Sequence, residues 1–232
     1  VDWQLHCWFI PNPYDGGAIK TPNNAFSLEE GYMRSENSTE IDFAIMWENT
    51  TCKNVDEDIF RNYIVPYWME HYIKDPRYKK IEGKPFVSIY NASVFLQYVG
   101  SGNDAKAKEN IDYLRGEIKK LGYSDAVIMC ANLGLSDVSQ LKAMGFDGIH
   151  AYNWRDNTDN PATQQEYFNR ASANCDAVGI AFIPTVSGGI EETPWGRPSG
   201  KRASPTTFKT VLQYAKEKNY YNSSQYLGGD NI

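Results

Sequence analysis

Three carboxylates near the ends of predicted strands have the clearest capacity for chemistry in this chain. Glu48 closes an apolar run over residues 41–49, and Glu191 and Glu192 follow a run over residues 180–187. Cleavage of a glycosidic bond needs two carboxyl groups flanking the bond, about 5 to 9.5 Å apart. Glu48 with Glu191 or Glu192 could form that pair, and Glu48 is the best candidate because a buried charge is costly unless it is paired or used. The alternative is that all three are solvated loop residues.

Aromatic and amide side chains gather near the same strand ends. Aromatics make up 14% of the 232 residues, and their flat apolar faces can stack on sugar rings. Amides carry both donors and acceptors, which suits ligands rich in hydroxyl groups. The predicted substrate-binding set is Trp8, Trp47, Glu48, Asn49, Tyr90, Asn132, His150, Tyr152 and Trp195. Core packing is the alternative explanation for each member taken singly.

Motifs for other reaction classes are not found in the sequence. His6 and His150 are predicted on inward strand faces, where a satisfied core histidine is the commoner explanation, and no third ligand of the right kind accompanies them. We therefore expect no metal and no cofactor. A G-x-S-x-G elbow for acyl transfer and a glycine-rich phosphate loop after the first strand are both lacking.

Strands and helices alternate through six rounds along the chain. The predicted strands cover residues 3–9, 41–49, 85–90, 126–132, 147–153 and 180–187. The predicted helices cover residues 28–35, 56–74, 104–121, 136–145, 160–177 and 205–219, with a kink or a junction of two helices at Pro66. Alternation of this kind predicts a parallel sheet with helices outside it, in a single domain over residues 1–232.

The distribution of polar residues favours a barrel over an open sheet, because both faces of an open doubly wound sheet should be apolar. Alternate strand positions give one set that is rich in polar side chains: Gln4, His6, Trp8, Met46, Glu48, Ser88, Tyr90, Cys130, Asn132, His150, Tyr152, Thr185 and Ser187. The other set is apolar, as a helix-covered surface should be. We predict a (β/α)8 TIM-type barrel, incomplete in this chain with six parallel strands, and a site at the carboxyl ends of those strands.

Charge and composition exclude several classes of partner. The formal net charge is −6 without any basic run, which argues against nucleic acid and anionic membrane surfaces. No segment is apolar enough to span a membrane. The four cysteines show no CxxC pair, so the redox compartment stays open. The chain begins at Val1, almost directly in a strand, which suggests a processed or excised fragment of a longer protein. We expect a location outside the cytoplasm, whether periplasmic, cell-surface or secreted.

Several segments together resemble a known group of enzymes. Residues 43–49 read Phe-Ala-Ile-Met-Trp-Glu-Asn, residues 78–85 follow Tyr-x-x-Ile-x-Gly-Lys-Pro, and residues 147–152 read Asp-Gly-Ile-His-Ala-Tyr. With the run at residues 184–189 that leads to Pro194 and Trp195, they resemble the glycoside hydrolase family 99-like and WbsX-like barrels over nearly the whole chain.

The resemblance implies a (β/α)8 barrel whose better-known members are retaining, metal-independent endo-acting α-mannosidases and mannanases. Other members are glycosyltransferases of polysaccharide synthesis. It also implies that Glu48 and Asn49 line the sugar subsites, with Tyr90, Tyr152 and Trp195 as neighbours. The family's first strand would lie upstream of Val1. Its catalytic carboxylates lie in a Trp-Asn-Glu-Trp-x-Glu-Gly segment of the eighth strand that has no counterpart up to Ile232, so the acid and base cannot be assigned.

The leading hypothesis is a retaining endo-glycosidase-like barrel acting on mannose-type or related polysaccharide, with the catalytic carboxylate segment outside this chain. Its partners would be the oligo- or polysaccharide substrate and the remaining barrel strands of the parent chain. One alternative is a non-catalytic carbohydrate-binding barrel. Another is a glycosyltransferase of polysaccharide assembly, although a nucleotide-sugar donor would need a diphosphate site, and no metal-binding DxD motif or phosphate-cradling loop is identified.

Overall fold

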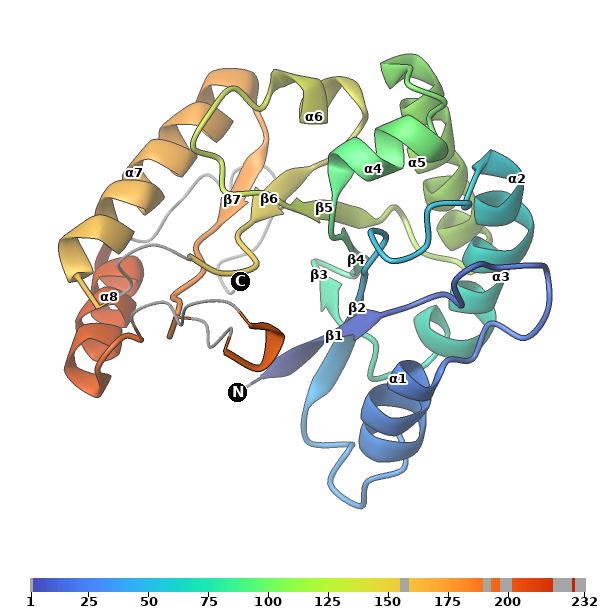
Figure 1. Ribbon diagram of the computed structural model, residues 1–232, viewed down its shortest axis with the longest axis horizontal. Coiled ribbons are helices and arrows are strands. Elements are labelled where there is room, and N and C mark those ends of the chain that lie inside the picture. Colours follow the sequence, from blue (N-terminus) through green and yellow to red (C-terminus); the bar gives the residue numbers. More distant parts are fainter. Residues whose placement is uncertain (1, 155–158, 190–192, 197–201, 219–226, 228–232) are drawn as a thin grey trace. The chain divides into compact units, whose positions relative to one another are not determined.

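The predicted alternation of strands and helices is confirmed by a computed structural model of the chain (Figure 1), which describes residues 2–154, 159–189, 193–196, 202–218 and 227. The chain forms two compact units. The first comprises Val1–Cys130 and Ala143–Phe146, and the second comprises Ala131–Lys142 and Asp147–Ile232. The single domain expected over residues 1–232 stays a prediction.

Parallel strands form the sheet of the first unit. Its strands lie in the order β1 (Trp3–Trp8), β2 (Asp42–Trp47), β4 (Lys84–Ile89) and β5 (Val127–Ala131, the last residue belonging to the second unit). The short β3 (Lys80–Ile81) pairs antiparallel with β4. Cys7 lies opposite Met46, and Met46 lies opposite Ser88. Because these neighbours share a face, the register fixes which side of every strand points away from the helices.

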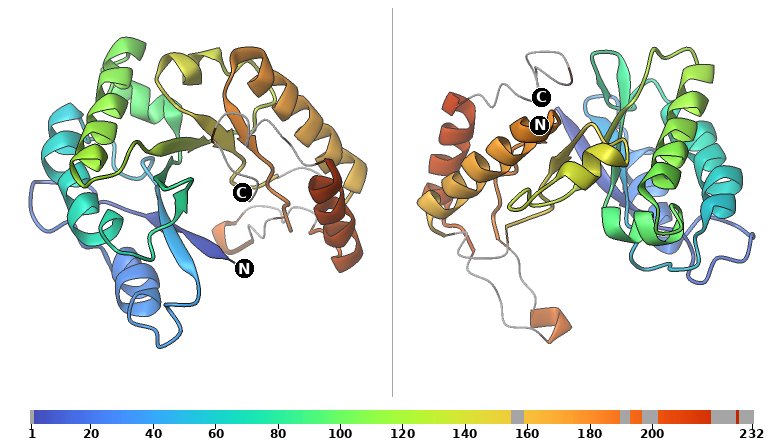
Figure 2. Two further views of the ribbon diagram at one scale, coloured as in Figure 1. Left: turned by 180° about the vertical axis from the view of Figure 1, so that it is seen from behind. Right: turned by 90° about the horizontal axis from the view of Figure 1, so that it is seen from above.

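Helices lie along one side of these strands (Figure 2). They are α1 (Pro22–Asn24) continuing as η1 (Ala25–Tyr32), α4 (Ala92–Tyr98), α5 (Asp104–Lys120), and a run made of α2 (Glu57–Ile59), η2 (Phe60–Ile64), α3 (Val65–Trp68) and η3 (Met69–Ile73). Asn103 caps α5 by accepting from the Lys106 N–H at 3.1 Å. The buried residues Ile111, Leu114 and Ile118 then make one apolar stripe along that helix.

Pro66 lies within a helical run that continues from residue 57 to residue 73. The backbone hydrogen bonds change to the wider π-type spacing on both sides of it, in η2 and η3. Pro66 itself occupies one of the first two positions of α3, where a missing N–H is tolerated best. The interruption expected at Pro66 is therefore a change of hydrogen-bond register.

The second unit contains β6 (Gly148–His150) and β7 (Ala181–Ile183), which pair in parallel, and the helices α7 (Pro161–Val178) and α8 (Pro205–Lys218). It also includes η4 (Thr193–Trp195) and most of α6 (Ser139–Ala143). Asn160 caps α7 by accepting from the Ala162 N–H, and Gly179 ends that helix with a φ of 71°. The Ser204 hydroxyl accepts from the Thr207 N–H at the start of α8. Both Pro-containing helix starts were predicted from the sequence.

Aromatic rings fill the core between the sheet of the first unit and its helices. Trp47 stacks on Phe60 with ring centroids 5.7 Å apart, and the edge of Trp68 meets both Trp8 and Trp47. Phe95 closes the cluster at 5.5 Å from Phe60. All five side chains are buried. Much of the aromatic content that suggested sugar stacking is thus core.

The faces predicted for β1 and β5 are wrong. Trp8 lies opposite Trp47 in the register and packs against the helices, whereas the sequence placed it on the inward face together with His6. The centroid of the His6 ring lies 5.2 Å from that of Tyr32, the last residue of η1. In β5, Cys130 lies opposite Ile89, which shares the face of Trp47. Cys130 therefore also faces the helices, although the sequence placed it on the inward face. Alternation divides a strand into two faces, but only its pairing with a neighbour decides which face meets the helices.

Two further elements differ from the sequence prediction. Helix α4 was not predicted, although the Asn91 side chain caps it by accepting from the Val94 N–H at 3.0 Å. The first helical segment begins at Pro22, six residues earlier than expected.

All four cysteines are free thiols. Among the described helices, none has the length and hydropathy that a membrane crossing would need.

Candidate functional site

Glu48 lies immediately after β2, on the face opposite Trp47, as strand alternation predicted. Its backbone N–H donates to the Trp8 carbonyl at 2.8 Å, which extends the β1–β2 pairing by one position. Its carboxylate folds onto the following turn and accepts from the Thr50 hydroxyl, the Thr50 N–H at 3.3 Å and the Thr51 N–H at 3.2 Å. The side chain is half-buried. Glu48 is therefore held in one orientation while part of it remains open to solvent.

Tyr90 lies beside Glu48 at the end of the next strand. Trp47 lies opposite Ile89 in the register, and the Tyr90 N–H donates to the Trp47 carbonyl at 2.9 Å. The next residue of each strand, Glu48 and Tyr90, is therefore on the same face, the one without the aromatic core. Both are half-buried. This places one carboxylate and one phenol next to each other at the carboxyl ends of two parallel strands.

Asn49 is buried and joins two loops, which differs from the ligand-facing position predicted for it. Its amide NH2 donates to the Asn91 carbonyl, and its amide oxygen accepts from the Asn91 N–H, both at 2.9 Å. The two hydrogen bonds tie the turn after β2 to the turn after β4. Asn49 holds Glu48 and Tyr90 in position, and its amide is engaged within the fold.

Trp8 and Trp47 are also removed from any ligand. Trp8 is fully buried, and its indole N–H donates to the Tyr72 hydroxyl at 2.9 Å. Trp47 is 1% exposed in the aromatic core. Neither ring can stack on a sugar in this arrangement. One signal in the sequence could have identified both as core residues. The helical run at residues 57–73 is itself rich in aromatics, and these need large apolar side chains on the strands to pack against.

Asn132 and His150 are joined through the backbone in the second unit, but their side chains lie on opposite faces. Asn132 alternates with Cys130 and so lies on the face of β5 that was predicted wrongly. The Asn132 N–H donates to the His150 carbonyl at 2.9 Å, and the Asn132 amide oxygen accepts from the Gly134 N–H at 2.8 Å. His150 lies on the face of β6 opposite Ile149, as expected. Burial lowers the pKa of the imidazole to about 4, so the ring is neutral at pH 7. A buried neutral histidine of this kind fits the core interpretation.

The remaining predicted residues of the second unit are less enclosed. Tyr152 is 50% exposed, just beyond β6. Trp195 ends η4, and nothing further is described of its side chain. Glu191 and Glu192 lie outside the described residues. In the described part of the chain, no three His, Cys, Asp or Glu side chains come close enough to hold a metal ion.

The strand-end arrangement in the first unit can bind a polar ligand. Glu48 offers carboxylate lone pairs in a fixed orientation, and Tyr90 offers a phenol and an aromatic edge. Thr50 and Thr51, which orient the carboxylate, were not singled out from the sequence. A threonine pair two and three residues after a strand-end glutamate was the available signal, because hydroxyls and turn N–H groups commonly hold such a carboxylate.

Solved structures with a similar fold include an endo-α-mannosidase and a glycoside hydrolase-like protein. A GH99 endo-α-mannosidase from Bacteroides thetaiotaomicron, in complex with BIS-TRIS-propane, matches with a TM-score of 0.52 and 20% identity over 76% of this chain and 52% of that chain. A glycoside hydrolase-like protein matches with a TM-score of 0.55 and 13% identity over 84% of this chain and 59% of that chain. No protein-family model matches, and a search of curated protein sequences finds no similar protein.

These likenesses confirm the predicted fold class. The chain has the α/β architecture of the GH99-type (β/α)8 barrel, with parallel strands and outer helices. It spans a little over half the length of the solved structures that it matches. The resemblance of the sequence motifs to glycoside hydrolase family 99 is thereby supported at the level of fold.

Proposed function

We propose that this chain is the sugar-binding part of a glycoside hydrolase of the GH99 type, acting on mannose-type or related polysaccharide. The proposal depends on one observation: Glu48 and Tyr90 lie side by side on the same face, at the carboxyl ends of two neighbouring strands. Ligand sites of (β/α)8 barrels lie at the carboxyl ends of the strands, and the fold is shared with an endo-α-mannosidase. Such substrates are polymers met outside the cytoplasm, so the proposal includes an extracytoplasmic location.

Glu48 serves the ligand as a fixed acceptor for sugar hydroxyls. The hydrogen bonds from Thr50 and Thr51 occupy part of its lone-pair capacity and prevent the side chain from rotating. Tyr90 adds a hydroxyl and a ring on the same face. Tyr152, half exposed just beyond β6, adds a phenol at a strand end of the second unit. The two carboxyl groups that cleave the bond are not assigned to residues of this chain.

A second candidate function is sugar binding without cleavage. After β1, β2 and β4, the positions on the ligand face are Phe9, Glu48 and Tyr90, which supply one carboxylate where a glycosidase needs two. That count holds for the described strand ends of the first unit. A binding barrel would use the same face and the same residues.

The residue-level test is the substitution Glu48→Gln. The single amide oxygen can still accept from the Thr50 donors, but the acceptor for the Thr51 N–H is replaced by an NH2 group. The charge that strengthens hydrogen bonds to sugar hydroxyls is also lost. We expect affinity for α-mannan oligosaccharides, measured by isothermal titration calorimetry, to fall at least about tenfold, which corresponds to about 1.4 kcal/mol. The variant Glu109→Gln on the exposed surface of α5 is the matched control and should bind normally. Unchanged affinity in Glu48→Gln would remove Glu48 from the site.

A further inference from the structure

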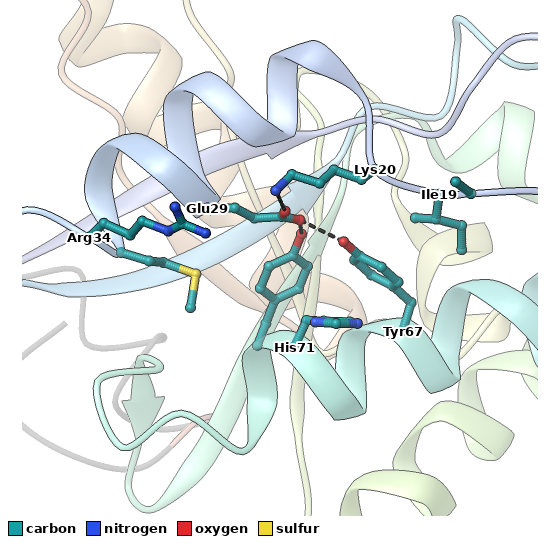
Figure 3. Close-up of a pocket in the computed structure, with 9 residues that line it drawn as sticks. Ile19, Lys20, Glu29, Arg34, Tyr67 and His71 are labelled. Carbon is teal, nitrogen blue, oxygen red and sulfur yellow. Dashed lines mark hydrogen bonds and ion pairs between the residues drawn. The ribbon is translucent and has the colours of Figure 1, made fainter.

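A cavity lies on the helix-covered side of the first unit (Figure 3). It measures about 490 Å³ and is formed by the loop before α1, the helix η1 with the residues after it, and the run from α3 to η3. We call it the Glu29 pocket. The residues that the argument uses are Ile19, Lys20, Glu29, Arg34, Tyr67 and His71. Its volume is in the range of small-ligand sites.

The floor of the Glu29 pocket is a fixed carboxylate. Glu29 accepts from the Tyr67 hydroxyl at 2.6 Å and from the Tyr72 hydroxyl at 2.8 Å, and its second oxygen pairs with the Lys20 ammonium at 3.1 Å. Tyr72 in turn accepts from the buried Trp8 indole at 2.9 Å. Burial works against ionisation, but these hydrogen bonds outweigh it and lower the pKa of Glu29. The carboxylate is therefore charged at neutral pH and is anchored to the core.

Arg34 is the cation of the pocket whose donors remain available. Lys20 already pairs with Glu29 and, at 2.8 Å, with Glu30. The exposed Arg34 guanidinium makes no hydrogen bond or close ion pair with any described residue, although its charge helps to lower the pKa of Glu30. Figure 3 shows it extending toward Glu29. Guanidinium presents a planar fork of donors that matches a carboxylate with two parallel hydrogen bonds. This side of the pocket is suited to an organic acid.

The opposite side of the Glu29 pocket is a ring surface. Tyr67 and His71 lie one helical turn apart, with ring centroids 4.1 Å apart and planes inclined by 35°. Both are labelled in Figure 3 below Lys20, with Ile19 alongside. Together they form an apolar wall against which the C–H face of a sugar ring can pack. A carboxylate recognised by Arg34 and a ring packed on Tyr67 belong to one ligand of the size of a monosaccharide acid.

We propose that the Glu29 pocket binds an acidic sugar residue, with its carboxylate on Arg34, its hydroxyls on the Glu29–Lys20 pair and its ring against Tyr67 and His71. The proposal rests on the proposed function only in taking carbohydrate as the ligand class. It adds a contact for a uronate unit of a polysaccharide on the outer side of the sheet, separate from Glu48 and Tyr90.

The test uses the 232-residue chain and three probes, glucuronate, glucose and acetate, with binding followed by NMR titration or calorimetry. Glucuronate should bind at least about tenfold more tightly than glucose or acetate. Arg34→Gln should weaken glucuronate binding at least about tenfold and leave glucose binding unchanged. Arg170→Gln removes an exposed arginine of α7 and is the matched control, with no expected effect. His71→Ala tests the ring wall and should weaken binding of glucuronate but not of acetate.

Each contrary outcome overturns a defined part of the proposal. Equal binding of acetate and glucuronate would leave an anion site without sugar recognition. Equal binding of glucose and glucuronate, unaffected by Arg34→Gln, would refute recognition of the acid. Absence of glucuronate binding would refute the site. Because Glu48→Gln is tested with neutral mannan oligosaccharides, the two experiments fail independently, and loss of one proposal leaves the other standing.

Discussion

Asn49 supports the candidate site without facing the ligand. Its amide joins two turns through a pair of hydrogen bonds with Asn91, so it fixes the backbone from which Glu48 and Tyr90 project. Removing such a buried amide leaves its partners unsatisfied, at a cost of about 1 to 3 kcal/mol. Asn49 therefore contributes to any ligand affinity through position.

His150 makes stability depend on pH in a predictable direction. Burial lowers the pKa of the folded imidazole from 6.5 to about 4, so between those values the unfolded chain binds a proton that the folded chain does not. Stability is then complete above pH 6.5 and is lost as the pH falls toward 4, by up to about 3 kcal/mol. Urea unfolding between pH 7.5 and 5 should show this loss.

His150→Gln is the variant that isolates this effect. Its stability should fall less than that of the parent chain over the same pH range. Burial lowers the pKa of His6 as well, which acts in the same direction, so a residual slope is expected. A variant whose pH dependence matches that of the parent would show that the His150 imidazole does not carry the effect.

At the scale of elements, close approach between β6 and β7 makes Gly148 sensitive to substitution. A methyl group added there would lie 2.4 Å from the Ala181 carbonyl oxygen and 2.8 Å from the Ala181 Cβ. Gly148→Ala should therefore cost about 1 to 3 kcal/mol of stability. Gly116→Ala is the matched control, because nothing lies within 4 Å of the added carbon on α5, and a helix-interior Ala gains about 0.5 to 1 kcal/mol. Equal urea midpoints for the two variants would contradict this account.

The order and type of most elements could be predicted because they depend on local signals. Strand alternation, the Asn160-Pro161 cap and the Ser204-Pro205 cap are read within a few residues. The face of β1 could not be read in this way, since both of its faces carry bulky residues and only the register with β2 places Trp8 under the helices. The same holds for Cys130 in β5. The inward faces predicted for β1 and β5 are therefore wrong. The face predicted for Glu48 is confirmed, because Phe43, Ile45 and Trp47 make the other face of β2 uniformly bulky.

At the scale of the whole molecule, the proposal predicts binding without turnover by this chain alone. Glycosidic cleavage needs two carboxyl groups, and the described strand ends of the first unit present only Glu48. The chain should bind α-mannan oligosaccharides and release no new reducing ends in a reducing-sugar assay that detects an active endo-α-mannosidase. Release of product would contradict the prediction. It would make Glu191→Gln and Glu192→Gln the variants that identify the second carboxylate.

The hydrogen bonds between the Asn49 side chain and the Asn91 backbone have a consequence for producing the protein. Both asparagines stand in Asn-x-Ser/Thr sequences, Asn49-Thr50-Thr51 and Asn91-Ala92-Ser93, which are acceptors for N-linked glycans in eukaryotic secretory pathways. A glycan on Asn49 would be attached to the nitrogen that donates to Asn91, in a buried position. In yeast or animal secretion, a glycan on Asn49 would prevent the hydrogen bonds that join the two turns. A bacterial host leaves the side-chain amides of Asn49 and Asn91 unmodified.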